Sequence, residues 1–148
     1  MPRVMIVEDD RTILENMAQL LTLSGLHVLE AHDGMMAMNL LQQLKDTPDH
    51  RPCLIISDLM MPSMDGYQLL RAVRKDPVYE TLPFVLLSAR SDASDIQRAF
   101  ALGASDYLVK PFEVEQLIEL VRYHLGQPRE AVGVPADDQA AGPDFVLE

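Results

Sequence analysis

The sequence holds little that would cross-link the chain or anchor it. It has a single cysteine, Cys53, which excludes an internal disulfide and, at the head of an apolar run, is expected to be a small buried residue. No apolar run approaches the length that spans a membrane, and the first residues lack the cationic start and apolar segment of a secretory signal. These features predict a cytoplasmic protein without a membrane anchor.

Basic residues are also scarce. The chain has 12 Lys and Arg residues against 23 Asp and Glu residues, which gives a net charge of -11. Such a charge opposes contact with a nucleic-acid backbone or an anionic lipid surface, so we expect no direct binding to either. The 148 residues, 48% of them apolar, are enough for one domain with a single core.

Short apolar runs alternate with segments of helical period along most of the chain. The runs expected to form strands are 3–7, 27–31, 53–57, 83–88 and 106–109. A helical segment follows each run, and the glycines Gly25 and Gly126 are typical stops for the first and last helices. Strands that alternate with helices favour right-handed crossovers and a parallel sheet covered on both faces. The predicted fold class is therefore a doubly wound α/β domain with five strands and five helices.

Apolar spacing also predicts which face each helix buries. In the helix from about residue 11 to 24, the residues on one face include Ile13, Met17 and Leu21, and Asp10 is expected to be the N-cap. In the fourth helix, Ala99 and Phe100 are expected to face the core with their neighbours at helical spacing.

The last part of the sequence has a different composition. Residues 127–148 are rich in Pro, Ala, Gly and Asp and show no apolar period. They are expected to be an acidic linker or tail that follows a domain spanning residues 1–126. The closing letters, DFVLE, could also begin the first strand of a further domain.

Acidic, hydroxyl and basic side chains lie where the predicted strands end. Glu8 and Asp9 follow the first strand, Asp58 follows the third, Ser88 ends the fourth and Lys110 follows the fifth. Because ligands bind beyond the carboxyl ends of parallel strands, we expect these side chains to share one pocket. Two carboxylates about 4 Å apart repel by about 1 kcal/mol in water and by more in a cleft. A hard cation such as Mg²⁺, which prefers oxygen ligands, would relieve this repulsion, and Lys110 adds a further positive charge.

Four segments, each at the end of its own predicted strand, carry a family resemblance. They read VMIVEDD, LIISDLMMPSMDG, LLSAR and GASDYLVKPF. In this order the chain resembles the receiver domain of two-component response regulators, the CheY-like group of the flavodoxin-like fold, over about residues 3–125. The resemblance implies the strand order 2-1-3-4-5.

The resemblance also implies roles for the acids. Asp58 matches the residue that accepts a phosphoryl group from a phosphohistidine, supplied by a histidine kinase or a phosphotransfer protein. Asp9 matches the direct ligand of Mg²⁺, or of Mn²⁺ in its place, and Glu8 matches an acid that acts through water. Met60 falls where the family uses a backbone carbonyl as a metal ligand.

Other roles concern the phosphoryl group and the response to it. Ser88 and Lys110 match the hydroxyl and the ammonium that bind phosphoryl oxygens, and the bond between Lys110 and Pro111 matches a cis peptide of the family. Tyr107 matches the switch aromatic, which moves inward when the hydroxyl residue is drawn to the phosphate. Glu8 stands where many members have aspartate, and Ser88 stands where threonine is commoner.

The output implied by the resemblance is a change in the face made by the fourth helix, the fifth strand and the fifth helix. A mixed apolar and polar patch there would suit a downstream effector protein or a second copy of the chain. The sequence leaves open whether the chain is a stand-alone receiver or the front of a longer regulator with a C-terminal output domain.

Three other functions are compatible with this fold class. An aspartyl-phosphate hydrolase needs a second acid two residues after the nucleophile, where this chain has Met60. A flavin or nucleotide binder needs a Gly-rich or Ser/Thr-rich loop after the first strand, where this chain has EDDRT. A receiver-like interaction module that is no longer phosphorylated is disfavoured by the intact Asp58, Ser88 and Lys110. The sequence favours a phosphorylation-dependent switch whose own chemistry is limited to self-phosphorylation and slow self-dephosphorylation.

Overall fold

The sheet has five parallel strands, as the alternating pattern predicts. The computed structural model describes residues 2–126, and the expected tail at 127–148 lies outside these residues. The strands are β1 (Arg3–Val7), β2 (His27–Ala31), β3 (Leu54–Asp58), β4 (Phe84–Ser88) and β5 (Asp106–Val109). Their order is β2-β1-β3-β4-β5 and every neighbouring pair is parallel. The predicted order 2-1-3-4-5 is confirmed.

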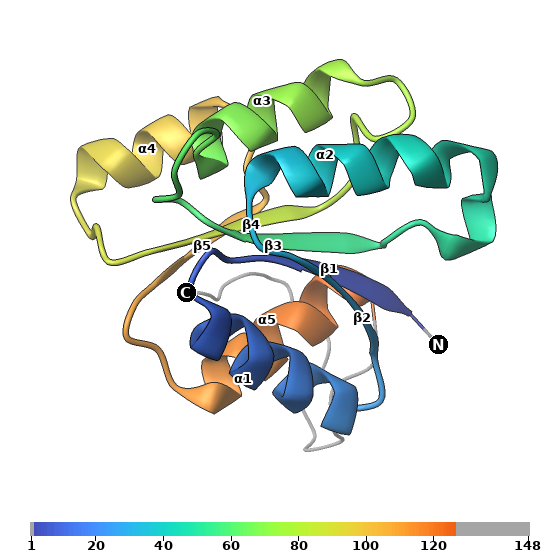
Figure 1. The fold of residues 1–148 in the computed structure, drawn as a ribbon. Coiled ribbons are helices and arrows are strands. Elements are labelled where there is room, and N and C mark those ends of the chain that lie inside the picture. Colours follow the sequence, from blue (N-terminus) through green and yellow to red (C-terminus); the bar gives the residue numbers. More distant parts are fainter. Residues whose placement is uncertain (1, 127–148) are drawn as a thin grey trace.

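Helices cover both faces of this sheet (Figure 1). They are α1 (Arg11–Leu23), α2 (Gly34–Gln43), α3 (Gly66–Lys75), α4 (Ala93–Ala101) and α5 (Val114–Leu125), with short 3-10 turns at Leu44–Asp46 and Pro48–His50. Figure 1 shows α1 and α5 on one face and α2, α3 and α4 on the other, and a separate buried apolar cluster fills each side. None of the helices in the described part of the chain is long and apolar enough to span a bilayer.

Two aspartates fix the points at which helices leave the carboxyl edge of the sheet. The side chain of Asp10 accepts a hydrogen bond from the Ile13 N–H at 3.0 Å, which confirms the predicted N-cap of α1. Asp65 and Gln68 form a capping box at the start of α3, with both bonds at 2.9 Å. These caps hold the loops that follow β1 and β3.

The start of α3 lies very close to the end of β3. A Cβ atom added to Gly66 would stand 2.6 Å from the carbonyl oxygen of Asp58 and 2.9 Å from the Cα of Leu59. The N–H of Gly66 also donates to the Leu59 carbonyl at 2.8 Å. Because only glycine leaves room for this approach, α3 is seated directly on the strand that carries Asp58.

The predicted buried faces of two helices are partly wrong. In α1 the chain buries Leu14, Met17 and Leu21, while Ile13 is exposed. In α4 only Ala99 is buried, and the Phe100 side chain is 47% exposed. The apolar positions of α1 form a stripe wider than its contact with the sheet, so spacing alone does not locate the centre of the buried face.

Cys53 is exposed, contrary to the prediction of a buried cysteine. Its backbone N–H donates to the Arg3 carbonyl at 2.8 Å, so the chain is already aligned with β1 at this point. The strand begins one residue later, at Leu54, and every residue from there to its end at Asp58 is buried. The error arises because strand boundaries are read from apolar character, which does not separate the first core residue from the residue before it.

Candidate functional site

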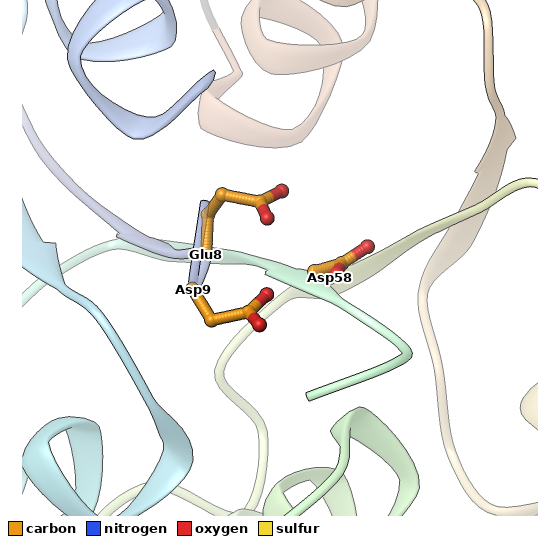
Figure 2. Close-up of side chains that lie close together, drawn as sticks. All are labelled: Glu8, Asp9 and Asp58. Carbon is orange, nitrogen blue, oxygen red and sulfur yellow. The ribbon is translucent and has the colours of Figure 1, made fainter. Parts of the chain in front are cut away.

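Three carboxylates meet at the carboxyl edge of the sheet (Figure 2). Glu8 and Asp9 follow β1, and Asp58 is the last residue of β3, the strand next to it. Each offers an oxygen that lies within 4.8 Å of those of the other two. Glu8 is 2% exposed and Asp58 is 6% exposed, whereas Asp9 is exposed. The cluster therefore has a buried side and a side open to solution.

Lys110 brings a positive charge to the buried side. Its Nζ lies 2.8 Å from Oδ1 of Asp58 and 3.3 Å from Oε1 of Glu8. Lys110 pairs with two of the three carboxylates, and its one positive charge is less than the charge of the cluster when all three acids are ionised. Charge-assisted hydrogen bonds of this kind are stronger than neutral ones and hold both buried acids in place.

The pKa values of these groups reflect burial and mutual charge. Burial raises the pKa of Asp58, and the negative charge of Asp9 adds to this, while Lys110 opposes both. Burial also raises the pKa of Glu8, against the N–H of Asp10 and the charge of Lys110, which lower it. For Lys110, burial lowers the pKa, but contacts with Asp58 and Glu8 outweigh burial and raise it overall. Ionisation of Asp58 and of Glu8 is thus less favourable in the folded protein than for the same groups in water.

The two acids after β1 are placed differently. One oxygen of Glu8 accepts the N–H of Asp10 at 3.1 Å, and the other oxygen faces Lys110. Asp9 instead borders a cavity of about 510 Å³, whose walls come from α1, β2, α2, the loop between β2 and α2, and Pro62. Of the three acids, Asp9 is thus the one that borders this cavity.

The donor set fits a hard divalent cation. All three groups are carboxylates, and oxygen is the donor that Mg²⁺ prefers. A cation here would also oppose the burial and like-charge repulsion that raise the pKa of Asp58. Met60, two residues after Asp58, is 55% exposed, and its thioether is a softer donor than Mg²⁺ prefers.

Ser88 lies at the same edge and is buried. In the sheet register Asp58 stands opposite Leu87, and Ser88 stands opposite Val109, the residue before Lys110. Its hydroxyl oxygen accepts the N–H of Arg90 at 3.0 Å, which ties Ser88 to the loop after β4.

Tyr107 lies away from the carboxylates. Its hydroxyl donates to the carbonyl of Arg90 at 3.0 Å, beside the loop that leads into α4. The peptide bond between Lys110 and Pro111 is cis. The structure therefore gathers Glu8, Asp9, Asp58 and Lys110 into direct proximity and places Tyr107 on the side of α4.

One group of contacts near this edge was not predicted from the sequence. The hydroxyl of the buried Tyr67 donates to the carbonyl of Asp95 at 3.1 Å, and the guanidinium of Arg98 stands over the Tyr67 ring, 4.3 Å from its centroid. The only sequence signal is an aromatic residue directly after the Asp65–Gly66 turn. Its partners are about 30 positions away and become apparent only in the fold.

Comparison with known proteins agrees with this arrangement. The family described as the response regulator receiver domain matches residues 4–122. The DNA-binding dual master transcriptional regulator RpaA of Synechocystis sp. is 36% identical over 122 residues, which are 82% of this chain and 48% of RpaA. The response regulator MprA of Mycobacterium avium is 33% identical over 136 residues, or 92% of this chain and 54% of MprA. The chain thus spans about half the length of these relatives.

Solved structures show the same fold. A putative response regulator from Chloroflexus aurantiacus is 36% identical with a TM-score of 0.74, covering 86% of this chain and all of that one (100%). The chemotaxis protein CheY4 of Vibrio cholerae is 32% identical with a TM-score of 0.75, covering 83% of this chain and 98% of that one. With the strand order, the acidic edge and the family match in agreement, this chain belongs to the response regulator receiver family.

Proposed function

We propose that this receiver domain is a phosphorylation-dependent switch in which Asp58 accepts a phosphoryl group. The donor is a phosphohistidine on a histidine kinase or phosphotransfer protein: a carboxylate oxygen of Asp58 attacks phosphorus, a P–O bond forms and the P–N bond breaks. The observation that carries the proposal is the buried Asp58 carboxylate, held by Lys110 at 2.8 Å within a cluster of three acids.

Lys110 and Ser88 are suited to receive the transferred group. A phosphoryl group brings a charge of about -1.5 to -2, which the ammonium beside Asp58 would partly neutralise. The oxygen of Ser88 already accepts the Arg90 N–H, so its hydroxyl hydrogen can be donated to a phosphoryl oxygen. Ser88 ends β4 and Lys110 directly follows β5, and these two strands come after β3 in the sheet order.

Mg²⁺ is the proposed cofactor, with Mn²⁺ as a substitute. Asp9, Asp58 and the backbone carbonyl of Met60 would hold it, and Glu8 would act through water. The cation supplies positive charge that stabilises the charge on the transferred phosphoryl group. Asp9 is suited to direct contact because it is the exposed member of the cluster, whereas Glu8 is engaged by Asp10 and Lys110.

The proposed output is a change in α4, β5 and α5. When Ser88 turns toward a phosphoryl group, the loop that contains Arg90 shifts with it, because the two residues share a hydrogen bond. The Arg90 carbonyl accepts the hydroxyl of Tyr107, so β5 is affected in turn and Tyr107 is the proposed switch aromatic. This face would bind a downstream effector protein, a second copy of the chain or a C-terminal output domain.

An aspartyl-phosphate hydrolase is a weaker explanation of the same site. Its general acid would stand two residues after Asp58, where the exposed Met60 has no proton to give. The contact between Lys110 and Asp58 likewise favours a domain that can still be phosphorylated over one that has lost the reaction.

The test is direct phosphorylation. Incubated with Mg²⁺ and acetyl phosphate, the protein should gain one phosphoryl group that is stable in acid and labile in base, as followed by intact mass. Asp58→Asn should abolish it. The matched control is Asp65→Asn, which changes a nearby aspartate to another good N-cap residue and should leave phosphorylation intact. Full labelling of Asp58→Asn would refute the assignment.

A further inference from the structure

The first turn of α4 is held from two sides, by residues that follow the strands of Asp58 and Ser88. On one side the Tyr67 hydroxyl donates to the Asp95 carbonyl at 3.1 Å. On the other side Nη1 of Arg90 lies 3.7 Å from Oδ1 of Asp95. Asp95 is therefore contacted both by a residue that follows β3 and by a residue that follows β4.

Tyr67 is rigidly placed relative to Asp58. It follows Gly66, whose missing side chain lets α3 sit against the Asp58 carbonyl. The Tyr67 side chain is buried in the cluster between the sheet and its helices, and Tyr107 packs against that cluster. Burial raises the pKa of the Tyr67 hydroxyl, with smaller contributions from Tyr107 and Asp95, so the hydroxyl stays protonated as a donor at neutral pH.

The ring of Tyr67 makes a second contact with the same helix. The Arg98 guanidinium stands 4.3 Å from the ring centroid, within the range of a cation–π interaction. Asp95 and Arg98 are three residues apart and therefore share one face of α4. A backbone carbonyl has two lone pairs, so the bond from Tyr67 adds to the helix's own hydrogen bond at Asp95.

The C-terminal end of α4 also contacts α3, through the turn that follows α4. Nε of Arg74 in α3 donates to the carbonyl of Gly103 at 2.9 Å, and Gly103 has a φ of +105° that suits glycine. This contact joins a side chain to the backbone of the turn after α4. The first turn is contacted by the Tyr67 hydroxyl and by the Arg90 side chain, both at Asp95, while the ring contact of Tyr67 with Arg98 lies further along the helix.

We propose that Tyr67 is a positioning residue that holds the first turn of α4 against α3 and so couples the state of Asp58 to the placement of α4. The inference rests on the proposed phosphorylation of Asp58. When Ser88 is drawn to a phosphoryl group, Arg90 acts on the Asp95 side chain while Tyr67 restrains the Asp95 carbonyl. The strength of the Tyr67 contacts then sets how far α4 responds.

Hydrogen exchange of the α4 amides tests this in the full chain, before and after treatment with Mg²⁺ and acetyl phosphate. Tyr67→Phe removes one hydrogen bond, so exchange in α4 of the untreated protein should accelerate about 2- to 10-fold. The change that phosphorylation causes in α4 should fall below half of its wild-type size.

Tyr79→Phe is the matched control. Tyr79 is also buried and also donates its hydroxyl to a backbone carbonyl, that of Leu41 in α2 at 2.5 Å. The same chemical change there should leave exchange in α4, and its response to phosphorylation, as in the wild type. Equal exchange in α4 of Tyr67→Phe and Tyr79→Phe would overturn the proposal.

Arg98 provides a rescue experiment. Arg98→Gln removes the cation above the ring and should weaken the response of α4 in the same direction as Tyr67→Phe, whereas Arg98→Lys retains a cation and should restore it. Identical behaviour of the two Arg98 variants would count against the ring contact. A protein that cannot be phosphorylated would refute the proposed function, but faster exchange in untreated Tyr67→Phe would still support the positioning role.

Discussion

The Nζ of Lys110 lies 2.8 Å from Oδ1 of Asp58, although the residues are 52 positions apart in the sequence. β4 stands between the strands that lead to them, so the lysine reaches past the end of that strand. It meets Glu8 from a third strand at 3.3 Å. The Lys110 side chain thus links the carboxyl ends of β1, β3 and β5.

Lys110→Gln should slow phosphorylation by acetyl phosphate at least about ten-fold, because it removes the charge that faces the transferred group. It should also raise the pKa of the Asp58 carboxyl further, since Lys110 is the main group that lowers it. Carboxyl chemical shifts followed through a pH titration would measure this. The control is Lys45→Gln, which breaks an ion pair with Asp76 at 2.6 Å away from the cluster. An unchanged Asp58 titration in Lys110→Gln would contradict the expectation.

Asp9→Asn should weaken Mg²⁺ binding more than Glu8→Gln does. Both substitutions remove one negative charge, but Asp9 is exposed beside the cavity, whereas the oxygens of Glu8 face Asp10 and Lys110. Direct contact with the cation is therefore expected at Asp9 and contact through water at Glu8. A calorimetric titration of each variant with Mg²⁺ gives the comparison. Equal losses would show that the two acids share the role.

In the absence of Mg²⁺, Asp58→Asn should raise the melting temperature at pH 7 by about 2–4 °C. The pKa of Asp58 is raised in the folded protein, so between its ordinary and raised values the folded state binds more protons than the unfolded state. Stability therefore falls as the pH rises through that window, and the loss persists at neutral pH. The Asn variant does not titrate and avoids this loss.

The difference in melting temperature between the wild type and Asp58→Asn should depend on pH and on Mg²⁺. As the pH falls below the ordinary pKa of an aspartate, 3.8, the wild-type acid becomes protonated in both states and the difference between the proteins should disappear. Added Mg²⁺ should stabilise the wild type, which binds it, more than Asp58→Asn. A wild type that melts above Asp58→Asn at pH 7 without Mg²⁺ would show that the pairing with Lys110 outweighs the effect of burial.

Gly66→Ala should lower the free energy of unfolding by about 1–3 kcal/mol, because the new Cβ would stand 2.6 Å from the Asp58 carbonyl oxygen. Gly34→Ala is the control: its Cβ would meet the side chain of Met64 at 2.8 Å, and a flexible methionine can move. Urea denaturation of both variants measures the difference. A loss at Gly66 no larger than that at Gly34 would mean that α3 can shift without penalty.

The fold and the carboxylate cluster could be predicted because both follow from local patterns. Alternating strands and helices define a parallel sheet, and the residues after each strand must then meet at one edge. Glu8, Asp9, Asp58 and Lys110 were placed together on this argument, and the structure brings them together.

Other features depend on packing between distant segments. The contact of Tyr67 with Asp95 and Arg98 joins two helices that the sequence does not mark as neighbours. The buried face of α1 was misplaced at Ile13 because the orientation of a broad apolar stripe is decided by the sheet beneath it. In both cases the sequence pattern describes a single helix and does not show which element packs against it.

The exposed thiol of Cys53 has a practical consequence. It is the sole cysteine of the sequence, and it precedes β3, so it marks the amino edge of the sheet, opposite to Asp58 at the other end of the same strand. A maleimide would attach one fluorophore, or one tether to a solid surface, at the amino edge of the sheet. An immobilised receiver would then present its acidic edge to the solution in a uniform orientation, where binding of a kinase could be timed without mutating the protein.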